Sequence, residues 1–141
     1  MRLEIKDFFE AAHMLDDTPD LVSKGCANLH GHTYYVIVVF EGKQKSNGMV
    51  IDFKRIKNLI SYYDHTTILQ NSEFNRSLQN LVRQKKYDQN FVMLESQPTA
   101  ENIALHILNK IKIILPELKD IQVHLCEGYK GEVRSSWVFV E

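Results

Sequence analysis

The chain has 141 residues, 44% of them hydrophobic and 25% charged, and this composition is that of an ordinary folded protein with one domain spanning residues 1–141. Seventeen basic and eighteen acidic side chains leave a net charge of −1, so we expect no nucleic-acid groove that works by neutralising phosphates. The longest apolar run, 34–40, is far shorter than the ~18 to 20 residues of a membrane-spanning helix, and the N-terminus lacks the pattern of a secretory signal. Together these features predict a cytoplasmic protein that binds neither nucleic acid nor a membrane.

The first third of the chain has the pattern of two strands. Apolar and polar residues alternate over 2–10, which predicts a half-buried strand. A loop rich in Asp, Pro and Gly follows over 15–25, and the β-branched and aromatic residues of 33–41 then predict a strong strand. After a turn over 42–48, we expect 49–51 to pair back as a short strand.

Helices are predicted in the middle of the chain by residues that can cap them. Asp52 precedes an apolar stripe that ends near Tyr63, and Ser72 precedes a shorter amphipathic segment that ends in Arg and Lys residues. Thr99 precedes the clearest helical pattern, which Pro116 closes. Between the last two helices, 91–94 has the composition of a strand fragment.

Two further strands are predicted at the C-terminal end, over 121–127 and 135–140, with a loop between them that carries Gly128 and Gly131. The order strand, strand, helix, helix, strand, strand places a hairpin at each end and segregates the helices. This order predicts an α+β fold, with an antiparallel sheet and helices on one of its faces.

Three histidines of the two N-terminal strands are candidate metal ligands. Side chains two residues apart in a strand lie on the same face, so His30 and His32 point the same way across Gly31. His13 ends the first strand and reaches the same place if the two strands form an antiparallel hairpin. Three neutral imidazoles with an open fourth position are the ligands of a catalytic zinc site. A histidine on a strand is more often a hydrogen-bonded structural residue, and from spacing alone that alternative stays open.

Cys26 lies near the same place, since only three residues separate it from His30. It has three interpretations. The sulfur could be a fourth ligand of a structural zinc site, or a free thiol whose pKa a nearby metal lowers and which acts as base or nucleophile. It could also be a small buried apolar residue.

Four acidic or hydroxyl side chains and one histidine complete the candidates. Asp64 stands beside His65 just after a predicted helix, where it could orient the imidazole for proton transfer or simply form a solvent-facing turn. Thr99 and Glu101 could serve a site, or only cap a helix and complement its dipole. Glu127 ends a strand and lies at the rim or points at a cationic or amide-like group.

Six short motifs occur in one order along the chain and together are specific. They are Phe9-Glu10-Ala11-Ala12-His13, Cys26-Ala27-Asn28-Leu29-His30-Gly31-His32, Gly48-Met49-Val50-Ile51-Asp52-Phe53, Asp64-His65, Pro98-Thr99-Ala100-Glu101-Asn102 and Glu127. This set resembles the family of 6-pyruvoyltetrahydropterin and 6-carboxytetrahydropterin synthases. The gap of three residues between the cysteine and the first histidine is similar to that of the 6-carboxytetrahydropterin synthases of the queuosine pathway, whereas the pyruvoyl enzymes typically have five.

The resemblance implies the tunnelling fold, in which subunits associate into closed barrels with active sites between them, and we expect a homohexamer built from trimers. It also assigns roles to residues of this chain. It implies zinc ligands at His13, His30 and His32, catalytic groups at Cys26, Asp64 and His65, a pterin-anchoring carboxylate at Glu127 and pocket-lining residues at Thr99 and Glu101.

The implied activity is a zinc-dependent lyase reaction. It converts 7,8-dihydroneopterin triphosphate to 6-carboxytetrahydropterin, acetaldehyde and triphosphate. Two alternatives remain: the pyruvoyl reaction, which keeps all three side-chain carbons, and a pterin-binding zinc oligomer without turnover.

Overall fold

The computed structural model describes residues 1–86, 88–128 and 136–141. Its elements in chain order are β1 (Arg2–His13), a 3-10 turn (Lys24–Ala27), β2 (His30–Glu41), α1 (Phe53–Ser61), β3 (Thr66–Gln70), α2 (Glu73–Gln84), β4 (Asn90–Leu94), α3 (Ala100–Ile114), β5 (Lys119–Glu127) and β6 (Ser136–Val140). Gly131 and Ser135, expected in the last loop and at the start of the last strand, lie outside the described residues. Within the described ranges, no helix is both long and apolar enough to cross a membrane.

Six strands form one sheet in the order β4-β3-β1-β2-β5-β6. The hairpin of β1 with β2 and the hairpin of β5 with β6 are antiparallel, as is the pairing of β2 with β5. The α+β class predicted from the sequence is therefore confirmed, as are the two terminal hairpins. The sheet is mixed rather than wholly antiparallel, because β3 runs parallel to both β1 and β4.

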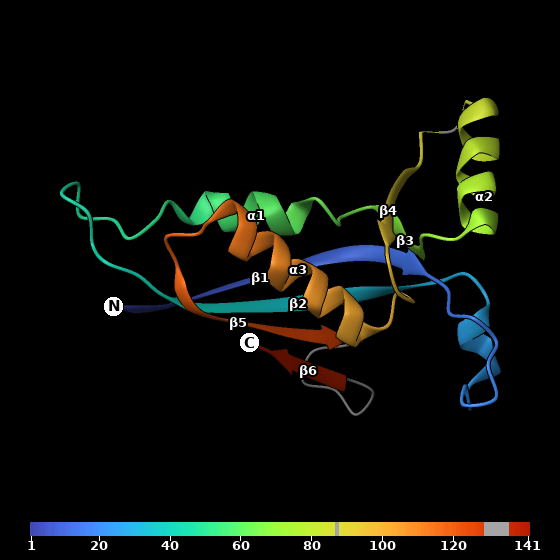
Figure 1. Ribbon diagram of the computed structural model, residues 1–141, viewed down its shortest axis with the longest axis horizontal. Helices are drawn as coiled ribbons and strands as arrows, with labels where there is room; N and C mark the ends of the chain where they lie inside the picture. Colours follow the sequence, from blue (N-terminus) through green and yellow to red (C-terminus); the bar gives the residue numbers. More distant parts are fainter. Residues whose placement is uncertain (87, 129–135) are drawn as a thin grey trace.

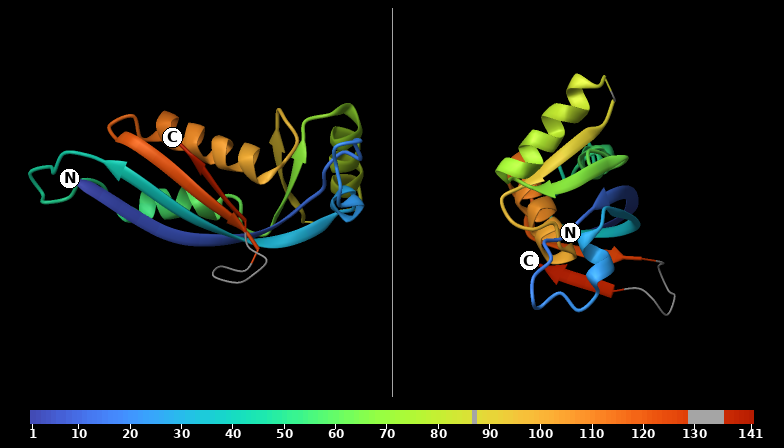
Figure 2. Two further views of the ribbon diagram at one scale, coloured as in Figure 1. Left: turned by 90° about the horizontal axis from the view of Figure 1, so that it is seen from below. Right: turned by 90° about the vertical axis from the view of Figure 1, so that its right-hand side faces the viewer.

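Helices α1 and α3 lie on the same side of a bowed sheet (Figure 1). The left view of Figure 2 shows this helical layer and the curved strands edge-on. The core forms between them and the sheet, where the rings of Phe9 and Tyr34 stack with centroids 4.9 Å apart. α3 contributes the fully buried Ile103, Ile107 and Ile111, at the spacing of one helix face. Helix α2 stands apart at the end of the molecule where the 14–29 loop also lies (Figure 1).

The predicted helix caps are confirmed. Asp52 accepts a hydrogen bond from the amide of Lys54, Ser72 from that of Asn75 and Thr99 from that of Asn102. Each side chain satisfies an amide that has no partner within its helix, which explains where α1, α2 and α3 begin.

Strand β3 was not predicted from the sequence. Its first four residues are all buried, so its side chains show no alternation between apolar and polar types. Because alternation is the usual sign of a strand, a short strand covered on both sides leaves little pattern to read. The parallel pair β3–β4 extends the sheet beyond β1 and confirms the strand fragment expected at 91–94.

The expectation of a short strand at 49–51 is wrong. Val50 and Ile51 are both buried, whereas consecutive side chains of a strand point to opposite faces. The amide of Lys45 donates to the carbonyl of Met49, which closes a turn instead of a strand pairing. The segment therefore leads directly into the Asp52 cap of α1.

Candidate metal centre and active site

The hairpin of β1 and β2 brings three imidazoles together at one end of the core. His13 pairs with His30 across the two strands, and Ala11 pairs with His32, so the three histidines lie on the same face. One nitrogen of each ring lies within 4.8 Å of the others. The predicted meeting of these three side chains is thus what the structure shows.

Backbone carbonyls fix two of these rings. Nδ1 of His13 lies 2.7 Å from the carbonyl oxygen of Pro98, and Nδ1 of His30 lies 2.7 Å from that of Asn28. Because a carbonyl oxygen can only accept, both Nδ1 atoms must carry the hydrogen. In the neutral rings Nε2 is then a lone-pair donor atom, which is the form that binds a metal.

Nε2 of His13 and Nε2 of His30 face each other at 3.0 Å. In the neutral rings neither atom carries a hydrogen, so the lone pairs repel unless a cation lies between them. Two nitrogens bound at about 2.1 Å to a tetrahedral zinc ion lie roughly 3.4 Å apart, close to the spacing seen here. The donor set of His13, His30 and His32 therefore fits a divalent metal such as zinc.

Glu127 at the end of β5 adjoins this cluster. Its Oε1 lies 3.3 Å from Nε2 of both His13 and His32, and the hydroxyl of Tyr34 donates to it at 3.4 Å. Burial lowers the pKa of both imidazoles, and burial together with the nearby carboxylate raises the pKa of the Tyr34 phenol. Burial therefore favours the neutral form of both imidazoles beside this carboxylate.

Asp64 and His65 occupy the turn between α1 and β3. The carboxylate of Asp64 accepts from the amide of Glu10 at 2.9 Å, while the amide of His65 donates to the carbonyl of Glu10 at 2.7 Å. The ring nitrogen Nδ1 of His65 lies 2.8 Å from Asp64 Oδ2. The Glu10 amide and the imidazole lower the pKa of the Asp64 carboxyl. The predicted orienting pair is therefore formed, and it is docked on β1.

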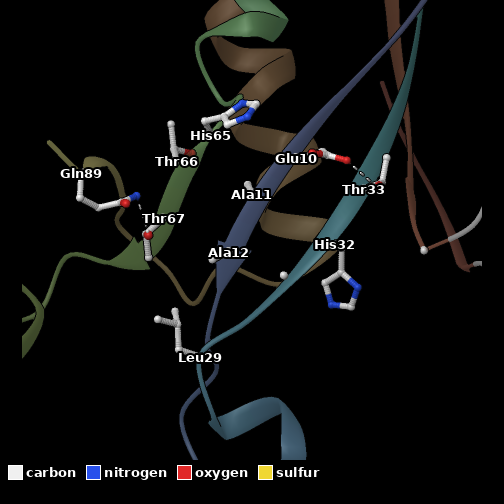
Figure 3. Close-up of a pocket in the computed structure, with 12 residues that line it drawn as sticks. Glu10, Ala11, Ala12, Leu29, His32, Thr33, His65, Thr66, Thr67 and Gln89 are labelled. Atoms are coloured by element: carbon white, nitrogen blue, oxygen red, sulfur yellow. Dashed lines mark hydrogen bonds between the residues drawn. The ribbon is translucent and has the colours of Figure 1, made fainter.

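A cavity of about 680 Å³ adjoins the Asp64–His65 turn, and His32 is the one residue of the imidazole cluster among those that line it. His65 and His32 contribute to its wall, as do Glu10 and Thr33, whose side chains meet at 3.4 Å (Figure 3). Among the described residues that line it, none is Lys or Arg. The cavity can hold a small molecule, but this part of the protomer supplies no cation for a polyanionic group.

The remaining predicted site residues lie outside the imidazole cluster. Cys26 is a half-buried free thiol on the 3-10 turn, and its carbonyl accepts from the amide of Leu15 at 2.9 Å. Within the described ranges, the one side-chain group suited to a metal contains the three histidines and not this cysteine. Thr99 caps α3 next to Pro98, and Glu101 is exposed on its first turn.

The contributors to the site that had not been predicted include one side chain and two residues that act through the main chain. Tyr34 continues the series of His30 and His32 at spacing two, so the same alternation rule could have found it. Pro98 and Glu10 act through main-chain atoms, for which the sequence carries no side-chain signal.

Comparison with known proteins places the chain in one family. Residues 2–139 match the family described as 6-pyruvoyl tetrahydropterin synthase. A 6-carboxy-5,6,7,8-tetrahydropterin synthase of Rickettsia typhi is 39% identical over 94 residues, which are 61% of this chain and 64% of that protein. The enzyme of the same name from Rickettsia conorii is 35% identical over 111 residues, covering 73% of this chain and 74% of the relative.

The fold is also that of this family. A catalytic-residue variant of 6-pyruvoyltetrahydropterin synthase from Plasmodium vivax superimposes with a TM-score of 0.64 at 20% identity, covering 100% of this chain and 98% of that one. The structure of the Plasmodium falciparum synthase gives 0.61 at 19% identity, covering 99% and 97%. The expected tunnelling fold is therefore confirmed for the protomer. The chain belongs to the 6-pyruvoyl tetrahydropterin synthase family.

Proposed function

We propose that the chain is a zinc-dependent 6-carboxytetrahydropterin synthase of the cytoplasm. It converts 7,8-dihydroneopterin triphosphate to 6-carboxy-5,6,7,8-tetrahydropterin, acetaldehyde and triphosphate, as a step toward queuosine. The names of the Rickettsia relatives support this choice within the family. The observation that carries it is the convergence of three imidazoles, two of them oriented by backbone carbonyls, beside the Glu127 carboxylate.

In this proposal His13, His30 and His32 hold the metal through Nε2. A bound zinc ion supplies Lewis acidity, which lowers the pKa of a coordinated hydroxyl much as it lowers that of water from 15.7 to about 7. The protein's part is to orient the rings: the carbonyls of Pro98 and Asn28 accept from Nδ1 of His13 and His30, which leaves Nε2 of each ring for the metal.

Glu127 anchors the pterin. The amino-pyrimidinone edge of a pterin has two adjacent N–H donors, which one carboxylate can accept in a fork. Tyr34 donates to Oε1 and limits the rotation of the carboxylate. Since Glu127 lies beside the imidazoles, an anchored ring would extend its side chain along the metal centre. Thr99 and Glu101 belong to the pocket in this proposal.

Proton transfer is assigned to groups outside the cluster. Cys26, as thiolate, removes a proton from the substrate side chain, and His65, oriented by Asp64, returns or relays protons. The cysteine is not part of the three-histidine group, so a coordination position stays open for substrate hydroxyls. This arrangement supports the proposed role of Cys26 as a base rather than as a fourth ligand.

We further propose that the active form is a homohexamer built from trimers. β4 and β6 are the outer strands of the sheet, and among the described residues no further strand pairs with the outer edge of either. A closed ring of subunits removes such edges, and a neighbouring subunit could supply the cations that the described cavity wall lacks. Light scattering at micromolar protein should report a multiple of three subunits, and a clean monomer would contradict this assembly.

Product analysis by mass distinguishes the three candidate functions. The zinc-loaded protein is incubated with 7,8-dihydroneopterin triphosphate, and pterins and trapped aldehyde are measured. Release of acetaldehyde with the carboxy product supports the proposal. A product that retains all three side-chain carbons identifies the pyruvoyl reaction instead, and pterin binding without turnover identifies a non-catalytic binder.

A further inference from the structure

The carbonyl of Pro98 that fixes His13 lies in a turn with its own hydrogen-bond support. The amide of Thr99 donates to the carbonyl of Gln97 at 2.8 Å, which closes a three-residue turn around Pro98. Such a turn has one short-range bond and would be mobile without further contacts.

Asn102 on the first turn of α3 supplies those contacts. Its Nδ2 donates to the carbonyl of Gln97 at 2.9 Å, and its amide donates to Oγ1 of Thr99 at 3.3 Å. Asn102 therefore holds the residues on both sides of Pro98. Because α3 is packed on the core through Ile103 and Ile107, the turn is fixed to a rigid element.

The chain of contacts ends at the metal centre. With Gln97 and Thr99 held, the carbonyl of Pro98 points at Nδ1 of His13 at 2.7 Å. His13 is 2% exposed, so no solvent is available to replace that acceptor. An acceptor that bonds the ring nitrogen not used for the metal sets both the tautomer and the direction of a ligating histidine.

We propose that Asn102 is a positioning residue of the metal site, which acts on His13 through the carbonyl of Pro98. The inference rests on the proposed ligation by His13. It adds that metal binding also depends on a residue that is not itself a ligand. It assigns a task to the last residue of the Pro98–Asn102 motif, whose side chain touches neither the cluster nor Glu127.

Two substitutions test the assignment without removing a ligand. Asn102→Asp keeps the shape and places an acid in the first turn, where the helix dipole favours it, but it has no donor for the Gln97 carbonyl. Asn102→Ala removes the donor without adding charge and keeps helix propensity. Asn109→Asp, an exposed site on the same helix, is the matched control for charge.

Zinc affinity is measured by competition with a chromophoric chelator, and the ring nitrogens are followed by ¹⁵N NMR. We expect both Asn102 variants to bind zinc up to about 10-fold more weakly than the parent and the control. This is the lower end of the range for removing a direct partner of a ligand, because the Pro98 carbonyl itself is retained. His13 should lose its single Nδ1–H tautomer in the metal-free protein, while His30, held by Asn28, keeps its own.

Parental affinity and an unchanged His13 tautomer in a folded variant would overturn the assignment. So would failure of both variants to fold, judged by circular dichroism, because Asn102 would then be a general determinant of the fold. If the parent protein itself binds no zinc, the proposed metal site fails first, and that result is distinct from the other two.

Discussion

The imidazole cluster and the Asp64–His65 turn use the same kind of side chain under opposite conditions. His13 is 2% exposed and fixed by a carbonyl from a segment 85 residues away in the chain. The side chain of His65 is 80% exposed, and its ring contacts the neighbouring carboxylate. The His13 ring is thus held by a residue outside its strand. At the turn, β1 holds the Asp64 carboxylate and the His65 backbone, and the His65 ring is bonded only to Asp64 among the described contacts.

The difference matches two chemical tasks. A metal ligand has to present one lone pair in one direction, so rigidity and exclusion of water favour binding. A group that accepts and returns protons must exchange them, so access to solvent and some freedom are useful. The protomer thus brings together all three imidazoles of the proposed metal centre. It leaves the imidazole proposed for proton transfer, His65, open to substrate or to a neighbouring subunit.

Removing a ligand should have the largest effect. In His30→Ala and His32→Ala, only two imidazoles remain, and we expect the zinc content to fall from about one ion per chain to near zero with loss of turnover. Elemental analysis of the purified variants measures this. His124→Ala, an imidazole on β5 outside the cluster, should retain its zinc. Full zinc content in both variants would place the metal elsewhere.

Removing the thiol should separate catalysis from binding. In Cys26→Ala we expect turnover to fall on the order of 10² to 10⁴, the range for a positioned acid or base, while zinc content and pterin affinity are kept. All three are measured on one preparation. Joint loss of zinc and pterin binding would show instead that the sulfur is a structural ligand.

Replacing the exposed imidazole should cost less. In His65→Gln we expect turnover to fall by about 10², the lower end of the same range, because water can substitute in part for a solvent-facing proton carrier. Zinc content should be unchanged, and stability should stay within about 0.5 kcal/mol, as for other surface substitutions. Steady-state kinetics and urea unfolding measure these. Loss of zinc in this variant would contradict the separation of the two regions.

Two matched caps give the smallest and most discriminating comparison. Thr99→Ala and Ser72→Ala each remove an N-cap, so each should lower the free energy of unfolding by about 1 kcal/mol. If Thr99 also lines the pterin pocket, only its variant should raise KM. Equal KM values in both variants would restrict Thr99 to capping.

The sequence predicted the parts of the site that depend on local periodicity. Alternation along β2 paired His30 with His32, and the antiparallel hairpin brought in His13, because strand geometry leaves little freedom. Contacts made by the main chain could not be predicted in this way. The carbonyl of Pro98 and both backbone groups of Glu10 become partners only through the tertiary fold.

The same limit applies to the fold. The terminal hairpins and the caps at Asp52, Ser72 and Thr99 follow from patterns a few residues long. Strand β3 depends on burial and on its parallel neighbours β1 and β4, which the chain acquires only in the tertiary fold.

The positions of the three histidines in the chain bear on the order of events during folding. His13 and His30 are 17 residues apart and belong to one hairpin, so their contact closes a short loop and can form early. The bond from His13 to Pro98 closes a loop of 85 residues and forms only when α3 docks. We therefore expect a growing polypeptide to contain all three histidines long before it can orient His13. An ion captured early would then be bound weakly and retained firmly only after the last third of the protein has folded.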